Sequence, residues 1–118
     1  MIKISNRIKI SKEYYGKIIL KIQELVTDTK VLDVGVVGNI KTPCKRHLIY
    51  TQFAKEKIGI DINKERIDYA ISQDIDNIFC LDICNKKDTL EIVEKFGLFD
   101  WVICSELIEH VGNARSFL

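Results

Sequence analysis

The stretch Val31–Asn39 constrains the fold more than any other part of this 118-residue chain. It reads Val-Leu-Asp-Val-Gly-Val-Val-Gly-Asn, a short apolar strand that runs directly into a turn containing Gly35 and Gly38. Because glycine has no Cβ, the backbone can turn tightly there and a ligand can approach it closely. A helix beginning beyond the turn would direct its free N–H groups toward the same ligand. The stretch therefore predicts the first strand and loop of a nucleotide-binding α/β fold.

Strand and helix signals alternate through the rest of the chain. The predicted strands cover residues 30–34, 57–61, 77–82 and 99–105. The predicted helices run from Ser11 to about residue 26, from 42 to about 55, over 64–73 and from 88 or 89 to 96, with a helical turn at 106–110. Such alternation makes βαβ units with right-handed crossovers. We expect one α/β domain over residues 1–118, a Rossmann-like parallel sheet of strand order 3-2-1-4 with helices on both faces.

Two helix starts carry capping signals that also predict which side chains point inward. Thr42 and Pro43 form a cap followed by a proline at the first helical position. Asn63 is a second capping residue. The helix after Thr42 is expected to bury Leu48, Ile49 and Phe53, and the helix after Asn63 is expected to bury Ile67, Ala70 and Ile71.

Charge and composition argue against several kinds of partner. The chain has 18 basic and 17 acidic residues and a net charge of +1, so no electrostatic force draws it toward nucleic acid or acidic membranes. No apolar run approaches the ~18 residues that a membrane helix needs, and the first residues lack the apolar core of a signal peptide. We therefore expect a cytoplasmic protein without nucleic-acid or membrane partners. The cysteines show no C-x-x-C pairing and are expected to be reduced, buried thiols: Cys44, Cys80, Cys84 and Cys104.

An acidic side chain lies at or just after the end of each predicted strand. Asp33, Asp61, Asp82 and Glu106 follow the four strands in order, and a parallel sheet places them along one crevice. A carboxylate after the second strand is well placed to accept hydrogen bonds from a ribose diol. One after the third strand could accept from the exocyclic amine of adenine, or could simply cap the next helix. For the second strand the capping role falls more naturally to Asn63.

Four segments, in order and at suitable spacing, resemble motifs of the class I S-adenosylmethionine-dependent methyltransferases. They are residues 31–39, 59–63, 81–82 and 99–111, and the resemblance spans about residues 11–118. It implies S-adenosyl-L-methionine as cofactor. It further implies that the methionine part lies against Asp33, Gly35, Gly38 and the segment containing Ser105, the ribose against Asp61 and Ile62, and the adenine against Asp82 and the backbone N–H of Ile83.

The segment after the fourth predicted strand supplies the candidate catalytic residues. Glu106, Glu109 and His110 lie at i, i+3 and i+4, on one face of a helical turn. His110 is the candidate base for the acceptor's proton, with Glu106 and Glu109 in the same active site. This E-x-x-E-H pattern also resembles the metal-binding segment of small-RNA 2′-O-methyltransferases and ubiquinone-pathway O-methyltransferases. A metal-free active site and a solvated or capping turn are the alternatives, and we assign no metal site.

The chain departs from the family pattern in two places. The family loop is D-x-G-x-G-x-G, whereas Val37 and Asn39 occupy its last two glycine positions here. The family sheet has seven strands, but this sequence supplies four, and strands five to seven are missing. Because an open strand edge exposes unpaired backbone groups, we expect either that a second copy or a partner chain covers the fourth strand, or that the chain is a fragment or a degenerate domain.

These features favour a methyltransferase acting on oxygen of a small-molecule or sugar-like acceptor, which the sequence does not identify. The Asp/Asn-Pro-Pro-aromatic run of enzymes that methylate base amines does not follow the fourth strand. Two alternatives to an O-methyltransferase stay open. The altered loop and missing strands favour a methyltransferase-like binding module without turnover. Asp61, about twenty residues after Gly38, would suit a nicotinamide-dependent Rossmann enzyme, although the G-x-G-x-x-G pattern fails at its second glycine.

Overall fold

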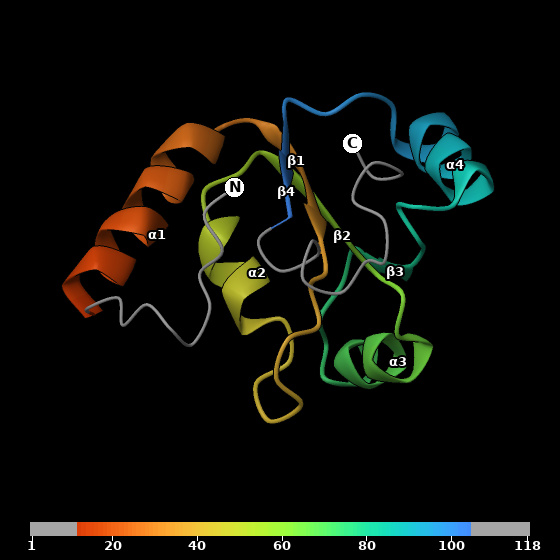
Figure 1. Cartoon of the computed structure of the whole chain (residues 1–118), viewed down its shortest axis with the longest axis horizontal. Helices are drawn as coiled ribbons and strands as arrows, with labels where there is room; N and C mark the ends of the chain where they lie inside the picture. The colour runs from red at the N-terminus through yellow and green to blue at the C-terminus, as the bar shows by residue number, and fades with distance from the viewer. Residues whose placement is uncertain (1–11, 105–118) are drawn as a thin grey trace.

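The computed structural model describes residues 12–104, with side chains from Gly16 onward. None of the helices within this range is both long and apolar enough to span a membrane. Helices and strands alternate along the chain, as predicted (Figure 1). The elements are α1 (Lys12–Val26), β1 (Lys30–Val34), α2 (Lys45–Tyr50), β2 (Glu56–Asp61), α3 (Lys64–Ser72), β3 (Ile78–Cys80), α4 (Lys86–Phe96) and β4 (Trp101–Ile103).

The four strands form one parallel sheet in the order β3-β2-β1-β4, which confirms the predicted topology. β1 is central. It pairs with β2 from Lys30 opposite Glu56 to Val34 opposite Ile60, and with β4 over three residues. Since every strand runs in the same direction, β1 and β2 deliver their carboxyl ends to the same edge of the sheet, where α/β proteins bind ligands.

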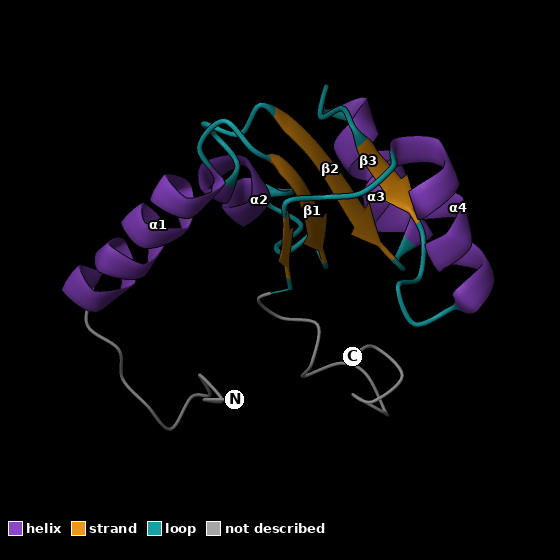
Figure 2. Ribbon diagram, turned by 90° about the horizontal axis from the view of Figure 1, so that it is seen from above, coloured by secondary structure: helices purple, strands orange, loops and turns teal. Residues whose placement is uncertain are grey.

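The two faces of the sheet bury separate apolar clusters. On one face, Leu32, Val34, Ile58 and Ile60 pack with Ile92 of α4. On the other face, the core consists of Val36, Val37, Cys44, Ile67, Ala70 and Ile78, drawn from the loop after β1, α3 and β3. Figure 2 shows α2 and α4 on opposite sides of the strands. The predicted helices on both faces are therefore confirmed, and the loop after β1 is itself part of the core.

The helix after the glycine turn is shorter than predicted. It covers Lys45–Tyr50 rather than residues 42 to about 55, and neither Thr42 nor Pro43 caps it. Its N-cap is Cys44, whose left-handed φ of 58° starts the helix without a side-chain hydrogen bond. At the other end, the backbone N–H and the hydroxyl of Thr51 both donate to the carbonyl of His47, at 3.0 and 2.7 Å, where the helix ends.

This shorter helix also faces the core with different side chains from those predicted. His47 and Tyr50 are buried. Leu48 and Phe53, which were expected inside, are 40% and 51% exposed. The prediction failed because the phase of an amphipathic helix was inferred from apolar residues alone, whereas the buried position one turn before Tyr50 is taken by a hydrogen-bonded histidine.

The other capping predictions have mixed outcomes. Asn63 caps α3 as expected, since its side chain accepts from the backbone N–H of Arg66 at 3.1 Å. Ile67 and Ala70 are buried, but Ile71 is 49% exposed. α4 begins at Lys86, not at residue 88 or 89, because Asn85 is the N-cap and accepts from the N–H of Asp88.

The last two strands are shorter than the sequence indicated. β3 covers three residues, and Asn77 before it has a φ of 54°, which does not fit a strand. β4 also covers three residues, with Trp101 and Val102 exposed at 42% and 50%. Among the described residues β4 pairs with β1 alone. The edge of the sheet at β4 therefore presents apolar side chains.

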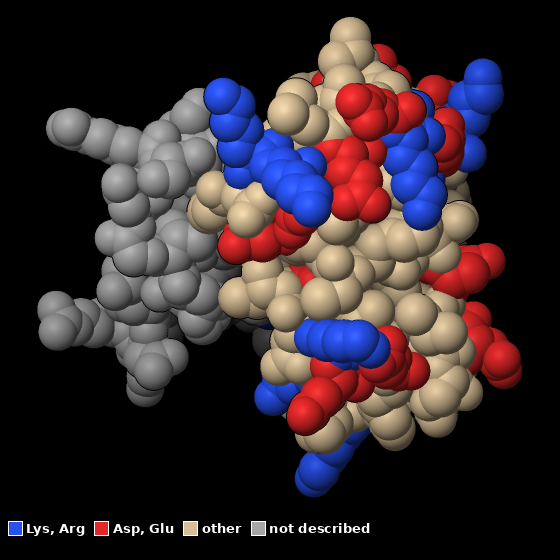
Figure 3. Space-filling view, turned by 90° about the vertical axis from the view of Figure 1, so that its right-hand side faces the viewer, with Lys and Arg blue, Asp and Glu red and all other residues tan. Residues whose placement is uncertain are grey.

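One face of the molecule can be inspected for charge in Figure 3. Lysine and arginine side chains alternate there with aspartate and glutamate, without an extended patch of one sign among the described residues. On this face, a mixed surface of this kind produces no strong field to steer a polyanion toward it.

Gly59 of β2 lies where neighbouring side chains leave no room for a Cβ. A Cβ at this position would lie 2.9 Å from Cγ1 of Val36, 3.1 Å from Cγ2 of Ile78 and 3.3 Å from Cε1 of His47. All three side chains belong to buried residues, so none can move aside freely.

We expect Gly59→Ala to lower the free energy of unfolding by about 1–3 kcal/mol, the usual cost of overpacking a core. Urea denaturation measures this change. Gly16→Ala in α1 is the matched control, because nothing lies within 4 Å of its added Cβ, and it should stabilise the chain by about 0.5–1 kcal/mol. Equal effects of the two substitutions would contradict the close packing at Gly59.

Candidate functional site

Two cavities lie at the carboxyl ends of β1 and β2. The smaller, of about 300 Å³, lies over the end of β2; the larger, of about 560 Å³, lies between the glycine turn, α1 and α2. Gly35, Gly38 and Arg66 line both. The smaller cavity is otherwise lined by Val34, Val37, Asp61, Ile62, Asn63, Leu81 and Ile83. The predicted glycine turn therefore forms the boundary between two adjoining spaces.

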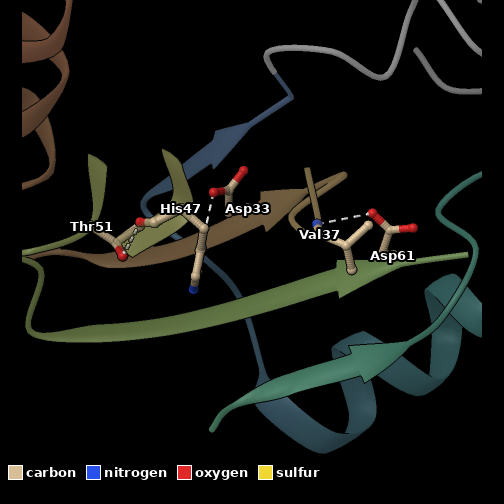
Figure 4. Close-up of polar contacts among 5 residues, drawn as sticks. All are labelled: Asp33, Val37, His47, Thr51 and Asp61. Atoms are coloured by element: carbon tan, nitrogen blue, oxygen red, sulfur yellow. Dashed lines mark hydrogen bonds and ion pairs between the residues drawn. The ribbon is translucent and has the colours of Figure 1, made fainter. Parts of the chain in front are cut away.

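Asp61, the last residue of β2, borders the smaller cavity with a partly satisfied carboxylate. Its Oδ2 accepts from the backbone N–H of Val37 at 3.2 Å (Figure 4). Its Oδ1 accepts from the N–H of Asn63 at 3.0 Å. An ionised carboxylate has about four acceptor positions. These two contacts fix its orientation and leave acceptor capacity for a ligand's hydroxyl groups.

Asp33 lies in a different environment from Asp61, although both follow strands of the same sheet. It is 4% exposed, and its Oδ2 lies 2.9 Å from Nδ1 of His47, which is 2% exposed (Figure 4). Both residues line the larger cavity. The pair joins β1 to α2 directly beneath the glycine turn, so that Asp33 has a structural role whether or not it also meets a ligand.

Sequence reasoning missed this partner of Asp33. His47 is a buried structural residue of α2. The available signal was the helical spacing of His47 and Tyr50, three residues apart, which places both on one face. An aspartate within an otherwise apolar buried strand also requires a buried donor somewhere in the fold.

The glycine turn continues the pairing between β1 and β2. The N–H groups of Gly35 and Val36 both donate to the carbonyl of Ile60, at 2.9 and 3.3 Å. Gly35 and Gly38 have φ angles of 83° and 55°, in the region that favours glycine. Val37, which occupies a family glycine position, is 6% exposed and packs in the core. The altered loop is therefore anchored by its valine side chain while its backbone still borders the cavities.

Asp82 has the contacts of a turn-forming residue. Its Oδ1 accepts from the N–H of Cys84 at 2.8 Å, and its own N–H donates to Asp88 at 2.9 Å. Leu81 and Ile83, on either side, line the smaller cavity, but Asp82 is not among its lining residues. Asn85, not Asp82, caps α4, so the capping alternative is wrong for Asp82, and a bond to adenine stays a prediction. Ser105, Glu106, Glu109 and His110 lie outside the described residues.

The thiols differ more than expected. All four are unpaired, but Cys80 is exposed, and Cys84 and Cys104 are partly buried, so the prediction of buried thiols is correct in full only for Cys44. Burial, together with the negative charges of Asp61 and Asp33, raises the pKa of the Cys44 thiol to about 11. Within residues 12–104 no group of three or more histidine, cysteine, aspartate or glutamate residues could hold a metal ion.

The fold and the site together define an α/β protein with two adjoining cavities at the carboxyl ends of its parallel strands. The chain is similar to the ubiquinone biosynthesis O-methyltransferases of two strains of Rickettsia bellii, at 31% identity over 96 residues. The match covers 79% of this chain and 36% of each relative. No family model matches the chain, and no solved structure matches it significantly. This distant similarity and the parallel α/β sheet both fit an S-adenosylmethionine-dependent methyltransferase.

The buried pair of Asp33 and His47 generates a stability prediction. His47→Ala would leave the Asp33 carboxylate without this partner inside the protein, which typically costs about 3–5 kcal/mol of unfolding free energy. Leu48→Ala, one residue further along α2 and 40% exposed, should cost less than about 1 kcal/mol. Urea denaturation of both variants measures the difference, and similar losses would contradict the structural role of the pair.

Cys44 and Cys80 should differ sharply toward iodoacetamide. At pH 8 the Cys44 thiol, with a pKa of about 11, is ionised in about one molecule in a thousand, and burial also blocks its access. We expect Cys80 to be labelled first and Cys44 to stay unlabelled until urea unfolds the chain, as followed by peptide mass spectrometry. Rapid labelling of Cys44 in the native chain would contradict its position in the core.

Proposed function

We propose that this chain carries the S-adenosylmethionine site of a class I methyltransferase that transfers a methyl group to an oxygen of a small-molecule acceptor. The observation that carries the proposal is the position of Asp61. It ends β2 at the edge of the smaller cavity, with acceptor capacity left after its two backbone contacts. The distant similarity to two O-methyltransferases supports the same activity.

The residues around the smaller cavity suit an adenosine group. Asp61 would accept hydrogen bonds from the ribose hydroxyls. Ile62, Leu81 and Ile83 provide apolar surface on which a purine ring could lie. Asp82, and the backbone N–H of Ile83, are proposed to meet the adenine edge.

The larger cavity suits the rest of the cofactor and the acceptor. Gly35 and Gly38 lie between the two cavities, and a Cβ on either would meet no atom within 4 Å, so the backbone is open to a close ligand. The methionine part would lie against these glycines, Asp33 and Ser105. S-adenosylmethionine supplies an electrophilic methyl group, which leaves the protein to orient the reactants and to manage a proton.

The proton-handling residues belong to the segment after β4. We propose that His110 takes the proton of the acceptor hydroxyl and that Glu106 and Glu109 lie in the same active site. The names of the matched relatives favour a hydroxyl acceptor. A cytoplasmic location, and a second copy or partner chain covering Trp101 and Val102 on β4, belong to the same proposal.

Nucleotide binding without turnover is the second candidate. The observation in its favour is the glycine turn. Val37 occupies the position of the second glycine of the family pattern, and its side chain packs in the core together with that of Val36. Cofactor binding without methyl transfer to any acceptor would favour this alternative.

The proposal predicts that the chain binds S-adenosylhomocysteine, the product of the cofactor, and that Asp61→Asn weakens this binding about tenfold or more. The reason is the loss of charged hydrogen bonds to the ribose, which typically contribute about 1.5–3 kcal/mol. Isothermal titration calorimetry measures the affinity of the parent chain and of the Asp61→Asn variant for S-adenosylhomocysteine. A separate titration with NAD tests the alternative cofactor.

Asp68→Asn is the matched control for that experiment. Asp68 lies on α3, is exposed and pairs with Lys64 at 2.6 Å, outside both cavities. Its substitution should leave the affinity unchanged. Selective binding of NAD, or an Asp61→Asn variant that binds S-adenosylhomocysteine as tightly as the parent chain, would refute the proposed cofactor site.

A further inference from the structure

We propose that Arg66 is a positioning residue, which holds the glycine turn in the conformation that both cavities share. Its effect on the cofactor rests on the function proposed above, whereas its effect on the turn does not.

Arg66 is fixed at both of its ends. Its backbone N–H donates to the side chain of Asn63 at 3.1 Å, within the cap of α3. Its guanidinium Nη1 donates to the carbonyl of Gly38 at 2.9 Å, across 28 positions of sequence. The capped start of α3 therefore determines where this side chain reaches the loop.

Gly38 has few other means of keeping its conformation. It is exposed, its φ is 55°, and no atom lies within 4 Å of the position that a Cβ would occupy. Packing in the apolar core thus ends at Val37, the residue immediately before Gly38. Beyond it, the loop is closed by contacts of its own, such as the N–H of Thr42 donating to Asn39. The bond from Arg66 is what ties the Gly38 carbonyl to the body of the domain.

The junction between β2 and α3 holds the turn at two successive points. Asp61 accepts from the N–H of Val37, and Arg66 donates to the carbonyl of Gly38. Arg66 also lines both cavities together with the two glycines. The same junction that presents Asp61 to one cavity therefore sets the shape of the boundary with the other.

Lys64 shows that a positive charge at the start of α3 is not sufficient for this contact. It lies two residues before Arg66, but its ammonium pairs with Asp68 on the same helix at 2.6 Å and lines neither cavity. Lys64 thus provides a charge-matched control at the same helix end.

Loss of the Arg66 contact should lower the fraction of molecules whose turn is correctly shaped, and the observed affinity falls in proportion to that fraction. The effect should be largest for a ligand that follows the turn from the smaller cavity into the larger one. S-adenosylhomocysteine has an amino-acid part that would do so, whereas 5′-methylthioadenosine lacks that part and would stay in the smaller cavity.

The first test uses the free chain and needs no ligand. Arg66→Met keeps an apolar stem and removes the donor, and Arg66→Lys restores one donor. By NMR, amide hydrogen exchange at Val37 and Cys44, which bracket Gly38, should accelerate about three- to tenfold in Arg66→Met. The rate should partly recover in Arg66→Lys and stay unchanged in Lys64→Met. Unchanged exchange in Arg66→Met, or equal acceleration of amides within β1 and β2, would overturn the proposal.

The second test measures ligand affinity by calorimetry with the same variants. Arg66→Met should weaken S-adenosylhomocysteine about three- to tenfold and 5′-methylthioadenosine less than about twofold. Equal losses, or none, would overturn the effect of Arg66 on the cofactor. If the parent chain binds neither compound, the proposed function fails, and the exchange measurement still decides the role of Arg66 in the turn.

Discussion

The pairing of β1 with β2, carried one step beyond the strands, is the interaction on which the rest of the site depends. The carbonyl of Ile60 accepts from Gly35 and Val36, so the loop leaves β1 while still attached to β2. This attachment places Val37 beside Asp61, and the next residue, Gly38, accepts from Arg66 of α3. The chain separates from the sheet only after Val37, and residues of this turn line both cavities.

Side chains, more than glycines, give the turn its shape. A loop with several glycines loses much conformational entropy when it becomes ordered. Here Val37 occupies one of these glycine positions and packs in the core at 6% exposure. Asp61 holds the backbone at the N–H of Val37, and Arg66 holds it at the carbonyl of Gly38. At this departure from the family pattern, the backbone is therefore restrained by the buried side chain of Val37, where a glycine would leave it more freely rotating.

The architecture was predictable from the sequence, but the details that depend on tertiary contacts were not. Apolar periodicity and the cap at Asn63 predicted the strands and α3, because these signals are local, and the alternation of strands with helices predicted the parallel sheet. The length of α2 depends on the left-handed Cys44 and on Thr51, and the burial of His47 depends on Asp33, fourteen residues away. Asp61 could be placed at the edge of the sheet from sequence, yet Arg66 could not, because its contact spans 28 positions with no motif.

The crowding at Gly59 links three separate parts of the chain. Side chains from the loop after β1, from α2 and from β3 meet over the space that its missing Cβ leaves. A larger residue at this position would therefore require a smaller one at Val36 or Ile78. Among related sequences this constraint would be visible as covariation, in which a gain of volume on β2 accompanies a loss of volume on a neighbouring element.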